Sequence, residues 1–332
     1  MPVDLLSREA HHLDHILPSW LALPDALRGT AFLHKDLLPK AVERGVQAVE
    51  VSEAPETGPL TLVASYLDLK LARKLGRLVV YSEHGAGQGY AQADGTPIGS
   101  GSYVGAIDRA GVVAVLVPGR LSAERHRRSH PTIPAFEVGV PKLDELHREP
   151  SRRVGDKPVV AVSFHWECRV CPETRSAFRH YRQGLKRLSQ SFELIGHGHP
   201  RGMAQFRRHY KQVGIEVVED FNEVIERADV YCVDNSSTLY EWASLGRPVV
   251  VMNAPWYRKK LEHGLRFWSH ADVGPQVSGP GQLAAGIEAA IADAPGAADR
   301  RQEIVADVYT ACDGRGVKRA SAALAEIAKE WG

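Results

Sequence analysis

The sequence predicts an α/β protein with two Rossmann-like domains whose parallel sheets face a central cleft. Short apolar runs alternate with amphipathic helical segments almost throughout the chain. A length of 332 residues suits two domains of about 150 residues each. Residues 150–158 form a polar stretch with proline at both ends, which is typical of a linker. We therefore expect one domain over residues 1–150 and a second over residues 151–332, whose last helix could pack back on the first domain.

In the first half, apolar runs rich in β-branched residues indicate buried parallel strands. These runs lie near residues 31–33, 46–51, 60–64, 78–81, 112–117 and 135–138. Segments with helical spacing of apolar residues separate them. These lie within residues 5–23, where we expect Pro18 to break the helix, and near residues 37–44, 66–75 and 122–128.

The second half repeats the alternation of strands and helices. Strands are expected near residues 159–164, 193–195, 216–218, 230–233 and 249–252. Helices are expected near residues 173–189, 203–212, 222–227, 238–245, 284–292 and 316–331. Each strand is followed by a helix, so the strands of each half should lie parallel, with ligand sites at their carboxyl ends.

The composition is that of a globular protein, with 44% hydrophobic and 24% charged residues. A net charge of +1 gives no general argument for nucleic-acid or membrane binding. Arginines are nevertheless dense between residues 120 and 187, which indicates either a solvated face or a site for an anionic acceptor. We expect a cytoplasmic protein, because the chain shows no secretory signal pattern and no apolar stretch of the ~20 residues that span a bilayer.

The segment from Val230 to Met252 is the most informative part of the chain. A buried strand ends at Asp234 and Asn235, and Ser236 and Ser237 then open a helix. Hydroxyls and backbone N–H groups at a helix start suit a phosphate or pyrophosphate. Glu241 lies one turn further along, where a carboxylate could accept hydrogen bonds from the hydroxyls of a ribose. An ordinary capped helix would show the same residue types.

His84 is the second candidate, because it follows the predicted strand 78–81 directly. A histidine at a strand end, beside glycines that admit a substrate, suits acid–base chemistry near neutral pH. The glycines Gly85, Gly87 and Gly89 are too closely spaced for a dinucleotide fingerprint. The alternative is a loop histidine without a role.

The third candidate is His197-Gly198-His199-Pro200, which follows the predicted strand 193–195. One of its histidines could donate a hydrogen bond to a phosphate oxygen. We predict no metal site, since no Asp-x-Asp triplet occurs and a histidine pair at this spacing is weak for zinc. The lone Cys168-x-x-Cys171 pair is interpreted as an incidental loop. The histidines at 11, 12 and 15 have helical spacing and are expected at a surface or interface.

Several short motifs follow one another in a fixed order over residues 75–330. They are His84-Gly85, residues 138–146 (VGVPKLDEL), residues 159–166 (VVAVSFHW), His199-Pro200, residues 234–237 (DNSS), Arg247-Pro248, residues 267–277 and Asp313-Gly314. In this order they resemble the motifs of the CDP-glycerol glycerophosphotransferases, the teichoic-acid primases and polymerases of the GT-B fold. The chain departs from that family at Lys142, Asn235 and His165, where the family has Arg, Tyr and Thr. It also lacks the family's lysine shortly after His-Gly.

The resemblance implies a transferase that needs no metal or other cofactor. By this resemblance, His84 would be the base that takes the proton of the acceptor hydroxyl or orients that hydroxyl, and His199 would hold a donor phosphate. Ser236 and Ser237 would stabilise the leaving phosphate and Glu241 would hold the ribose. Gly198 and Asn235 complete the donor-binding set.

The implied partners are a nucleotide diphosphate donor, either CDP-glycerol-like or a nucleotide sugar, and an acceptor hydroxyl on a small molecule or a polyanionic polymer. Three alternatives stay open: a GT-B glycosyltransferase or a UDP-sugar 2-epimerase-like enzyme, modification of a polyanion such as hydroxylated DNA bases, and a binding module without catalysis. The sequence predicts no oligomeric state.

Overall fold

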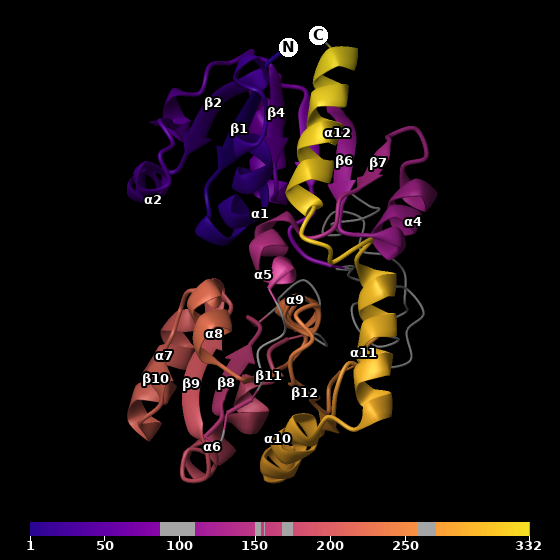
Figure 1. Cartoon of the computed structure of the whole chain (residues 1–332). Coiled ribbons are helices and arrows are strands. Elements are labelled where there is room, and N and C mark those ends of the chain that lie inside the picture. The colour runs from indigo at the N-terminus through magenta and orange to yellow at the C-terminus, as the bar shows by residue number, and fades with distance from the viewer. Residues whose placement is uncertain (87–109, 150–153, 156, 168–174, 258–269, 332) are drawn as a thin grey trace. The chain divides into compact units, whose positions relative to one another are not determined.

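The computed structural model of the chain describes residues 1–86, 110–149, 154–155, 157–167, 175–257 and 270–331. The chain divides into two compact units (Figure 1). Unit 1 consists of Met1–Ala86, Gly99–Glu149 and Asp307–Gly332, and unit 2 consists of Gly87–Ile98 and Pro150–Ala306. Among the described residues, no helix is both long enough and apolar enough to cross a membrane.

Unit 1 contains a parallel sheet of seven strands in the order β3-β2-β1-β4-β5-β6-β7. The strands are β1 (Val3–Ser7), β2 (Arg28–Leu33), β3 (Ala48–Glu50), β4 (Leu60–Val63), β5 (Val79–Ser82), β6 (Val112–Val117) and β7 (Ala135–Glu137). The helices of this unit are α1 (Ala10–Leu21), α2 (Leu38–Glu43), α3 (Tyr66–Lys74), α4 (Arg120–Ser129), α5 (Asp144–Arg148) and α12 (Gly316–Glu330).

Unit 2 contains a parallel sheet of six strands in the order β10-β9-β8-β11-β12-β13. The strands are β8 (Val159–Phe164), β9 (Glu193–Gly198), β10 (Glu216–Val217), β11 (Val230–Val233), β12 (Val249–Met252) and β13 (Gln276–Val277). The helices are α6 (Phe178–Leu188), α7 (Met203–Val213), α8 (Phe221–Arg227), α9 (Thr238–Ala243), α10 (Leu283–Ala292) and α11 (Pro295–Val308), whose last residues belong to unit 1.

The strand order reverses once in each sheet. In unit 1 the chain moves outward from β1 through β2 to β3, then restarts beside β1 at β4. In unit 2 it moves from β8 through β9 to β10, then restarts beside β8 at β11. Loops at such a reversal turn to opposite sides of the sheet and leave a crevice at the carboxyl ends of the two central strands. Each unit therefore has one preferred place for a ligand. The predicted class of two Rossmann-like domains with parallel sheets is confirmed.

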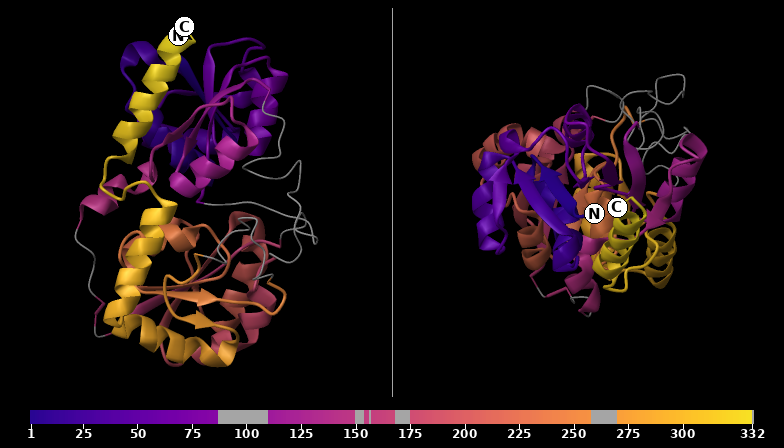
Figure 2. Two further views of the ribbon diagram at one scale, coloured as in Figure 1. Left: turned by 90° about the vertical axis from the view of Figure 1, so that its right-hand side faces the viewer. Right: turned by 90° about the horizontal axis from the view of Figure 1, so that it is seen from above.

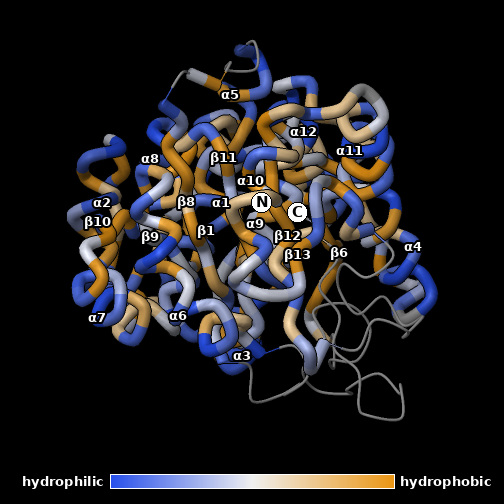
Figure 3. Tube along the Cα trace, turned by 90° about the horizontal axis from the view of Figure 1, so that it is seen from below, coloured by the Kyte–Doolittle hydropathy of each residue, from blue (hydrophilic) through white to orange (hydrophobic). Residues whose placement is uncertain are grey.

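Apolar side chains fill both units, because strands covered on both faces expose neither side to water. In the tube coloured by hydropathy, the strands of both sheets carry long hydrophobic stretches, whereas outer helices such as α2 and α7 show hydrophilic segments (Figure 3). The core of unit 1 includes Leu5, Leu62 and Val80 from three neighbouring strands. The core of unit 2 includes Val162 and Cys232 from its two central strands.

The last helix, α12, lies along unit 1 (Figure 2). Its residues Ala320, Leu324 and Ile327 are buried in the same apolar core as Ile16 and Leu17 of α1. The backbone nitrogen of Met1 donates to the carbonyl oxygen of Ala328 at 2.9 Å. The end of this chain therefore completes the core that its first residues begin.

Three expectations about the elements were wrong. Residues 5–7 belong to the strand β1, not to a helix, and β1 is a central strand of its sheet. The helix α1 continues through Pro18 to Leu21, since burial of its apolar face offsets the hydrogen bond that proline cannot donate. The strand β9 extends to Gly198, so His197 lies inside the strand and not after it. The elements β13 and α11 were not predicted.

Candidate functional site

The carboxyl end of β11 in unit 2 is built around Asp234. Its side chain accepts hydrogen bonds from the backbone N–H of His165 at 2.8 Å and of Ala177 at 2.9 Å. Asp234 is 1% exposed, and its two partners follow β8 and precede α6. The carboxylate thus joins the ends of the two central strands and fixes the segments that follow them.

The two predicted serines lie at the start of α9, directly after this clamp. Ser236 is 9% exposed and Ser237 is half-buried. The Thr238 hydroxyl donates to Ser236 Oγ at 2.9 Å, and the Tyr231 hydroxyl lies 2.8 Å from Thr238 Oγ1. The helix itself ends at Ala243, two residues before the expected end, so it contributes little dipole. Hydroxyl groups, more than a helix dipole, define the polarity of this edge.

Asn235 and Glu241 lie deeper than the serines. They are 2% and 1% exposed, and Glu241 is on α9. Its carboxylate is close enough to Tyr231 to help raise the pKa of that phenol, although burial is the larger cause. Tyr231 therefore keeps its proton throughout the ordinary pH range.

His199 follows β9 and is held in one tautomer by its own backbone. The N–H of Arg201 donates to His199 Nδ1 at 3.2 Å, so in the neutral ring the proton sits on Nε2. A histidine in this form can donate from Nε2 to a phosphate oxygen. The ring lies among other aromatic side chains, with its centroid 5.3 Å from His165 and 6.1 Å from Trp166.

The glycine before it, Gly198, has a packing reason to be small. A Cβ atom there would lie 2.4 Å from Phe206 Cδ2 and 3.1 Å from the carbonyl oxygen of Phe164. The neighbouring His197 points into the unit, is 6% exposed, and lies 2.9 Å from Ser163 Oγ through its Nδ1. The two histidines of the motif therefore have different surroundings, and only His199 stands at the strand end.

His165 and Trp166 were not among the predicted site residues. They follow β8, whose carboxyl end forms one wall of the crevice. Arg201 lies over the Trp166 ring at 5.3 Å from its centroid. Their signal in the sequence was their place directly after a buried strand, which is the position that led to His84 and Ser236.

In unit 1, His84 follows β5 and is half-buried. Its Nδ1 contacts the carbonyl oxygen of Ala64, which follows β4. Because a carbonyl only accepts, Nδ1 carries the proton and Nε2 is the basic nitrogen of the neutral ring. His84 is thus held in the opposite tautomer to His199, and its Nε2 has the form that a general base requires.

Three further histidines surround His84. The ring centroids of His12, His15 and His11 lie 4.3, 6.2 and 6.3 Å from that of His84. Our expectation that the three would lie at a surface or interface was wrong for His12, which is 4% exposed. The cause is topological: β1, β4 and β5 are neighbours, so the start of α1 meets the end of β5.

We call His11, His12, His15 and His84 the histidine cluster. Burial lowers the pKa of His15 well below its usual value, and the charges of Lys142, His84 and His11 lower it further. Lys142 belongs to the segment 138–146, whose turn η4 (Pro141–Leu143) packs on α1. His15 is therefore neutral at physiological pH.

One group in the described part of the chain has the composition of a metal site. Ligand atoms of Glu9, His11 and His12 all lie within 4.8 Å of one another. His11 Nε2 lies 3.5 Å from Glu9 Oε2, the geometry of an ion pair when the ring is protonated. Cys168 and Cys171, and the glycines from Gly87 to Gly101, lie outside the described residues.

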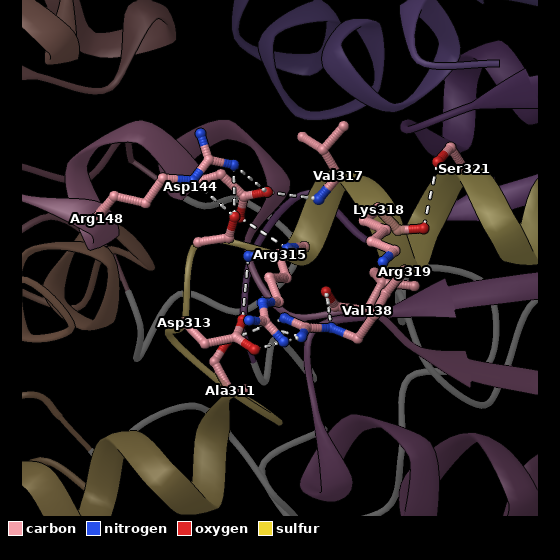
Figure 4. A network of polar contacts seen from close by, with 12 residues as sticks. Val138, Asp144, Arg148, Ala311, Asp313, Arg315, Val317, Lys318, Arg319 and Ser321 are labelled. Atoms are coloured by element: carbon pink, nitrogen blue, oxygen red, sulfur yellow. Dashed lines mark hydrogen bonds and ion pairs between the residues drawn. The ribbon is translucent and has the colours of Figure 1, made fainter.

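Two other motif segments meet in unit 1 and have a structural role (Figure 4). Asp144 is 4% exposed, and its carboxylate accepts from the backbone N–H of Gly316 at 2.8 Å and of Val317 at 2.7 Å. The Arg148 guanidinium donates to the carbonyl oxygen of Gly314 at 2.6 Å, and Asp313 forms an ion pair with Arg319 at 2.9 Å. These contacts, which we call the α12 latch, join the segment after β7 to the start of α12.

The two units, each with a doubly wound parallel sheet, give the chain the GT-B fold. No protein-family model matches the chain, and no curated protein sequence matches it. Solved structures do match over nearly the whole length. The wall teichoic acid polymerase TagF aligns with a TM-score of 0.64 and 13% identity, covering 99% of this chain and 89% of the other.

Two epimerase structures align similarly. A putative UDP-N-acetylglucosamine 2-epimerase from Listeria monocytogenes gives a TM-score of 0.63 at 13% identity, covering 99% of this chain and 97% of the other. The UDP-GlcNAc 2-epimerase from Neisseria meningitidis, bound to UDP-GlcNAc, gives 0.58 at 12% identity, covering 99% and 100%. At such identities the likeness shows the fold.

Proposed function

We propose that the chain is a transferase that moves a glycerophosphate or glycosyl group from a nucleotide diphosphate donor to an acceptor hydroxyl. The observation that carries this proposal is the set of polar side chains at the carboxyl ends of β11 and β9 in unit 2. There, two serines after β11 and the Nε2–H of His199 after β9 offer donors where doubly wound sheets bind phosphates. Two kinds of protein that share the fold support it by their names. TagF is named as a wall teichoic acid polymerase, and the epimerases are named for the nucleotide sugar UDP-GlcNAc.

In this proposal unit 2 binds the donor. His199 donates to one phosphate oxygen, and Ser236 and Ser237 donate to others. Glu241 and Asn235 lie behind them, where the carboxylate accepts from the ribose hydroxyls, and Gly198 keeps the strand end narrow. These donors stabilise the negative charge that grows on the leaving phosphate, which is the main catalytic contribution expected of such a site.

Unit 1 supplies the base. His84 Nε2 takes the proton of the acceptor hydroxyl while the acceptor oxygen forms its bond to the transferred group and the bond to the leaving phosphate breaks. The Ala64 carbonyl keeps the His84 proton on Nδ1, so that Nε2 is the nitrogen that can accept a proton in this step. No metal takes part, because hydroxyl, imidazole and amide donors stabilise the negative charge of the phosphates in place of a cation.

A nucleotide-sugar 2-epimerase is the second candidate, supported by the two epimerase folds that the chain covers almost completely. A donor panel separates the candidates. We expect CDP-glycerol or a UDP-sugar to release its nucleotide only when an acceptor is present. A small polyol and a teichoic-type polymer are the acceptors to be tested. Conversion of UDP-GlcNAc without an acceptor would favour the epimerase. If no donor reacts and neither CDP nor UDP binds, the proposal is wrong.

Binding can be tested without knowing the acceptor. Replacing both Ser236 and Ser237 by alanine should weaken CDP or UDP binding by at least tenfold, since a hydrogen bond to a charged group is worth about 1.5–3 kcal/mol. Ser189→Ala is the matched control, because that hydroxyl bonds the carbonyl of Lys186 at the exposed end of α6. Titration calorimetry gives both affinities, and equal values for the double variant and the control would remove the serines from the site.

A further inference from the structure

A continuous line of hydroxyl groups runs beneath Ser236. It begins at the Tyr231 hydroxyl, which lies 2.8 Å from Thr238 Oγ1. The Thr238 hydroxyl in turn donates to Ser236 Oγ at 2.9 Å. We call Tyr231, Thr238 and Ser236 the hydroxyl chain. It links β11 to the start of α9.

The direction of every bond in the hydroxyl chain follows from counting protons, since each hydroxyl has one. Thr238 gives its proton to Ser236, so the bond between Tyr231 and Thr238 must use the proton of Tyr231. All the protons therefore point from the interior toward Ser236.

Ser236 is the end of this line. Its oxygen already accepts the proton of Thr238, so its own proton must point away from the hydroxyl chain. The interior end of the hydroxyl chain, Tyr231, is 0% exposed, whereas Thr238 is half-buried and Ser236 is 9% exposed. Aligned hydroxyls polarise one another, which makes the last O–H a stronger donor than an isolated serine.

We propose that the hydroxyl chain fixes Ser236 as a hydrogen-bond donor to the ligand of unit 2, and that Tyr231 and Thr238 are positioning residues for it. The ligand atom opposite Ser236 is then an oxygen that accepts a hydrogen bond and carries negative charge. We assign it to an ionised phosphate of a nucleoside diphosphate. This inference rests on the proposed function, which places phosphates at the same serine.

The test removes one hydroxyl that cannot touch the ligand. Tyr231→Phe keeps the ring, which stacks on Trp242 with centroids 5.1 Å apart, and deletes only the fully buried oxygen. We expect the affinity for CDP or UDP to fall by roughly threefold to tenfold, the range of one net hydrogen bond. Thr238→Val interrupts the chain at a half-buried position and should have the same effect if Tyr231→Phe folds poorly.

Tyr181→Phe is the matched control. Tyr181 is equally buried in the same unit, but its hydroxyl donates to the carbonyl oxygens of Asn253 and Val277 at 2.8 Å each. Its loss should lower stability by as much as Tyr231→Phe does, yet leave the affinity unchanged.

The decisive readout is a double-mutant cycle with Ser236→Ala. If Tyr231 acts through Ser236, then Tyr231→Phe should weaken binding in the wild-type chain and have no further effect once Ser236 is alanine. Equal losses in both backgrounds would show a merely structural role and overturn the inference while leaving the proposed function standing. If Ser236→Ala itself leaves CDP and UDP affinity unchanged, the phosphate assignment of this serine fails, and the role of the hydroxyl chain fails with it.

Discussion

Asp144→Ala should weaken the attachment of α12 to the rest of unit 1. The Asp144 side chain is buried, and it caps α12 from another segment because the preceding residue, Arg315, offers no capping side chain. The variant leaves the N–H groups of Gly316 and Val317 without their charged acceptor. A lost cap costs about 0.5–2 kcal/mol, and a bond to a charged group is worth about 1.5–3 kcal/mol. For two such bonds at a helix start that water partly reaches, we expect a loss of about 2–4 kcal/mol.

Hydrogen exchange measured by peptide is the suitable assay, because a single melting temperature is poorly defined for a chain of two units. A loss of about 2–4 kcal/mol corresponds to roughly 30- to 1000-fold faster exchange in α12 and in α1, which packs on it. Peptides from β8 and β11 in unit 2 should exchange as in the wild-type chain.

Two comparisons refine this prediction. Asp313→Ala removes an exposed ion pair with Arg319 from the same latch and should cost less than about 1 kcal/mol. Gly316→Ala should resemble Asp144→Ala, since a Cβ there would lie 2.9 Å from Asp144 Oδ1 and 3.0 Å from Pro141 N. If protection of α12 in Asp144→Ala stays within threefold of the wild type, the capping argument is refuted.

Three further predictions concern the site. His84→Ala should lower kcat by about 10²–10⁴-fold with nearly unchanged donor affinity, whereas His199→Ala should reduce both kcat and donor affinity. A His84→Ala enzyme that keeps more than about a third of wild-type kcat would contradict the assignment of His84 as the base. Turnover should persist in EDTA, and loss of activity that magnesium or manganese restores would contradict metal independence. Because the pKa of His15 is lowered by burial, the unfolded chain binds its proton first, so unit 1 should lose stability as the pH falls below about 6.5. His15→Gln should flatten that pH dependence, and denaturation at several pH values measures it.

The sequence predicted most of the fold because parallel strands covered on both faces are nearly continuous apolar runs. Strands such as β6 and β8 are of this kind, and their bounds were predicted to the residue. The strand β1 was missed because Asp4 interrupts its apolar residues and α1 follows after two residues, so the two elements look like one helical segment. The strand β13 has two residues, of which only Val277 is apolar and buried, so no apolar run marked it.

The residues of the site likewise fall into those that the sequence predicted and those that it did not. Strand-end residues such as His84 and Ser236 could be found, since a polar residue after a buried run is visible locally. The histidine cluster could not, because His12 and His84 are brought together by the order of strands in the sheet. The hydroxyl chain was not predicted, because Tyr231 and Thr238 lie on different elements and only the fold brings their hydroxyls within 2.8 Å of each other.

The latch at α12 has a consequence for how the protein is made. A ribosome synthesises unit 2 after the strands of unit 1 but before α12, whose Leu324 and Ile327 cover Ile16 and Leu17. At about 5–20 residues per second, the residues between Glu149 and Gly316 take roughly 10–30 s to appear. During that time the apolar face of α1 lacks the cover of α12, while the strands of unit 2 are being made. The nascent chain therefore completes its second unit first, and chaperones that bind exposed apolar helices have their opportunity at α1.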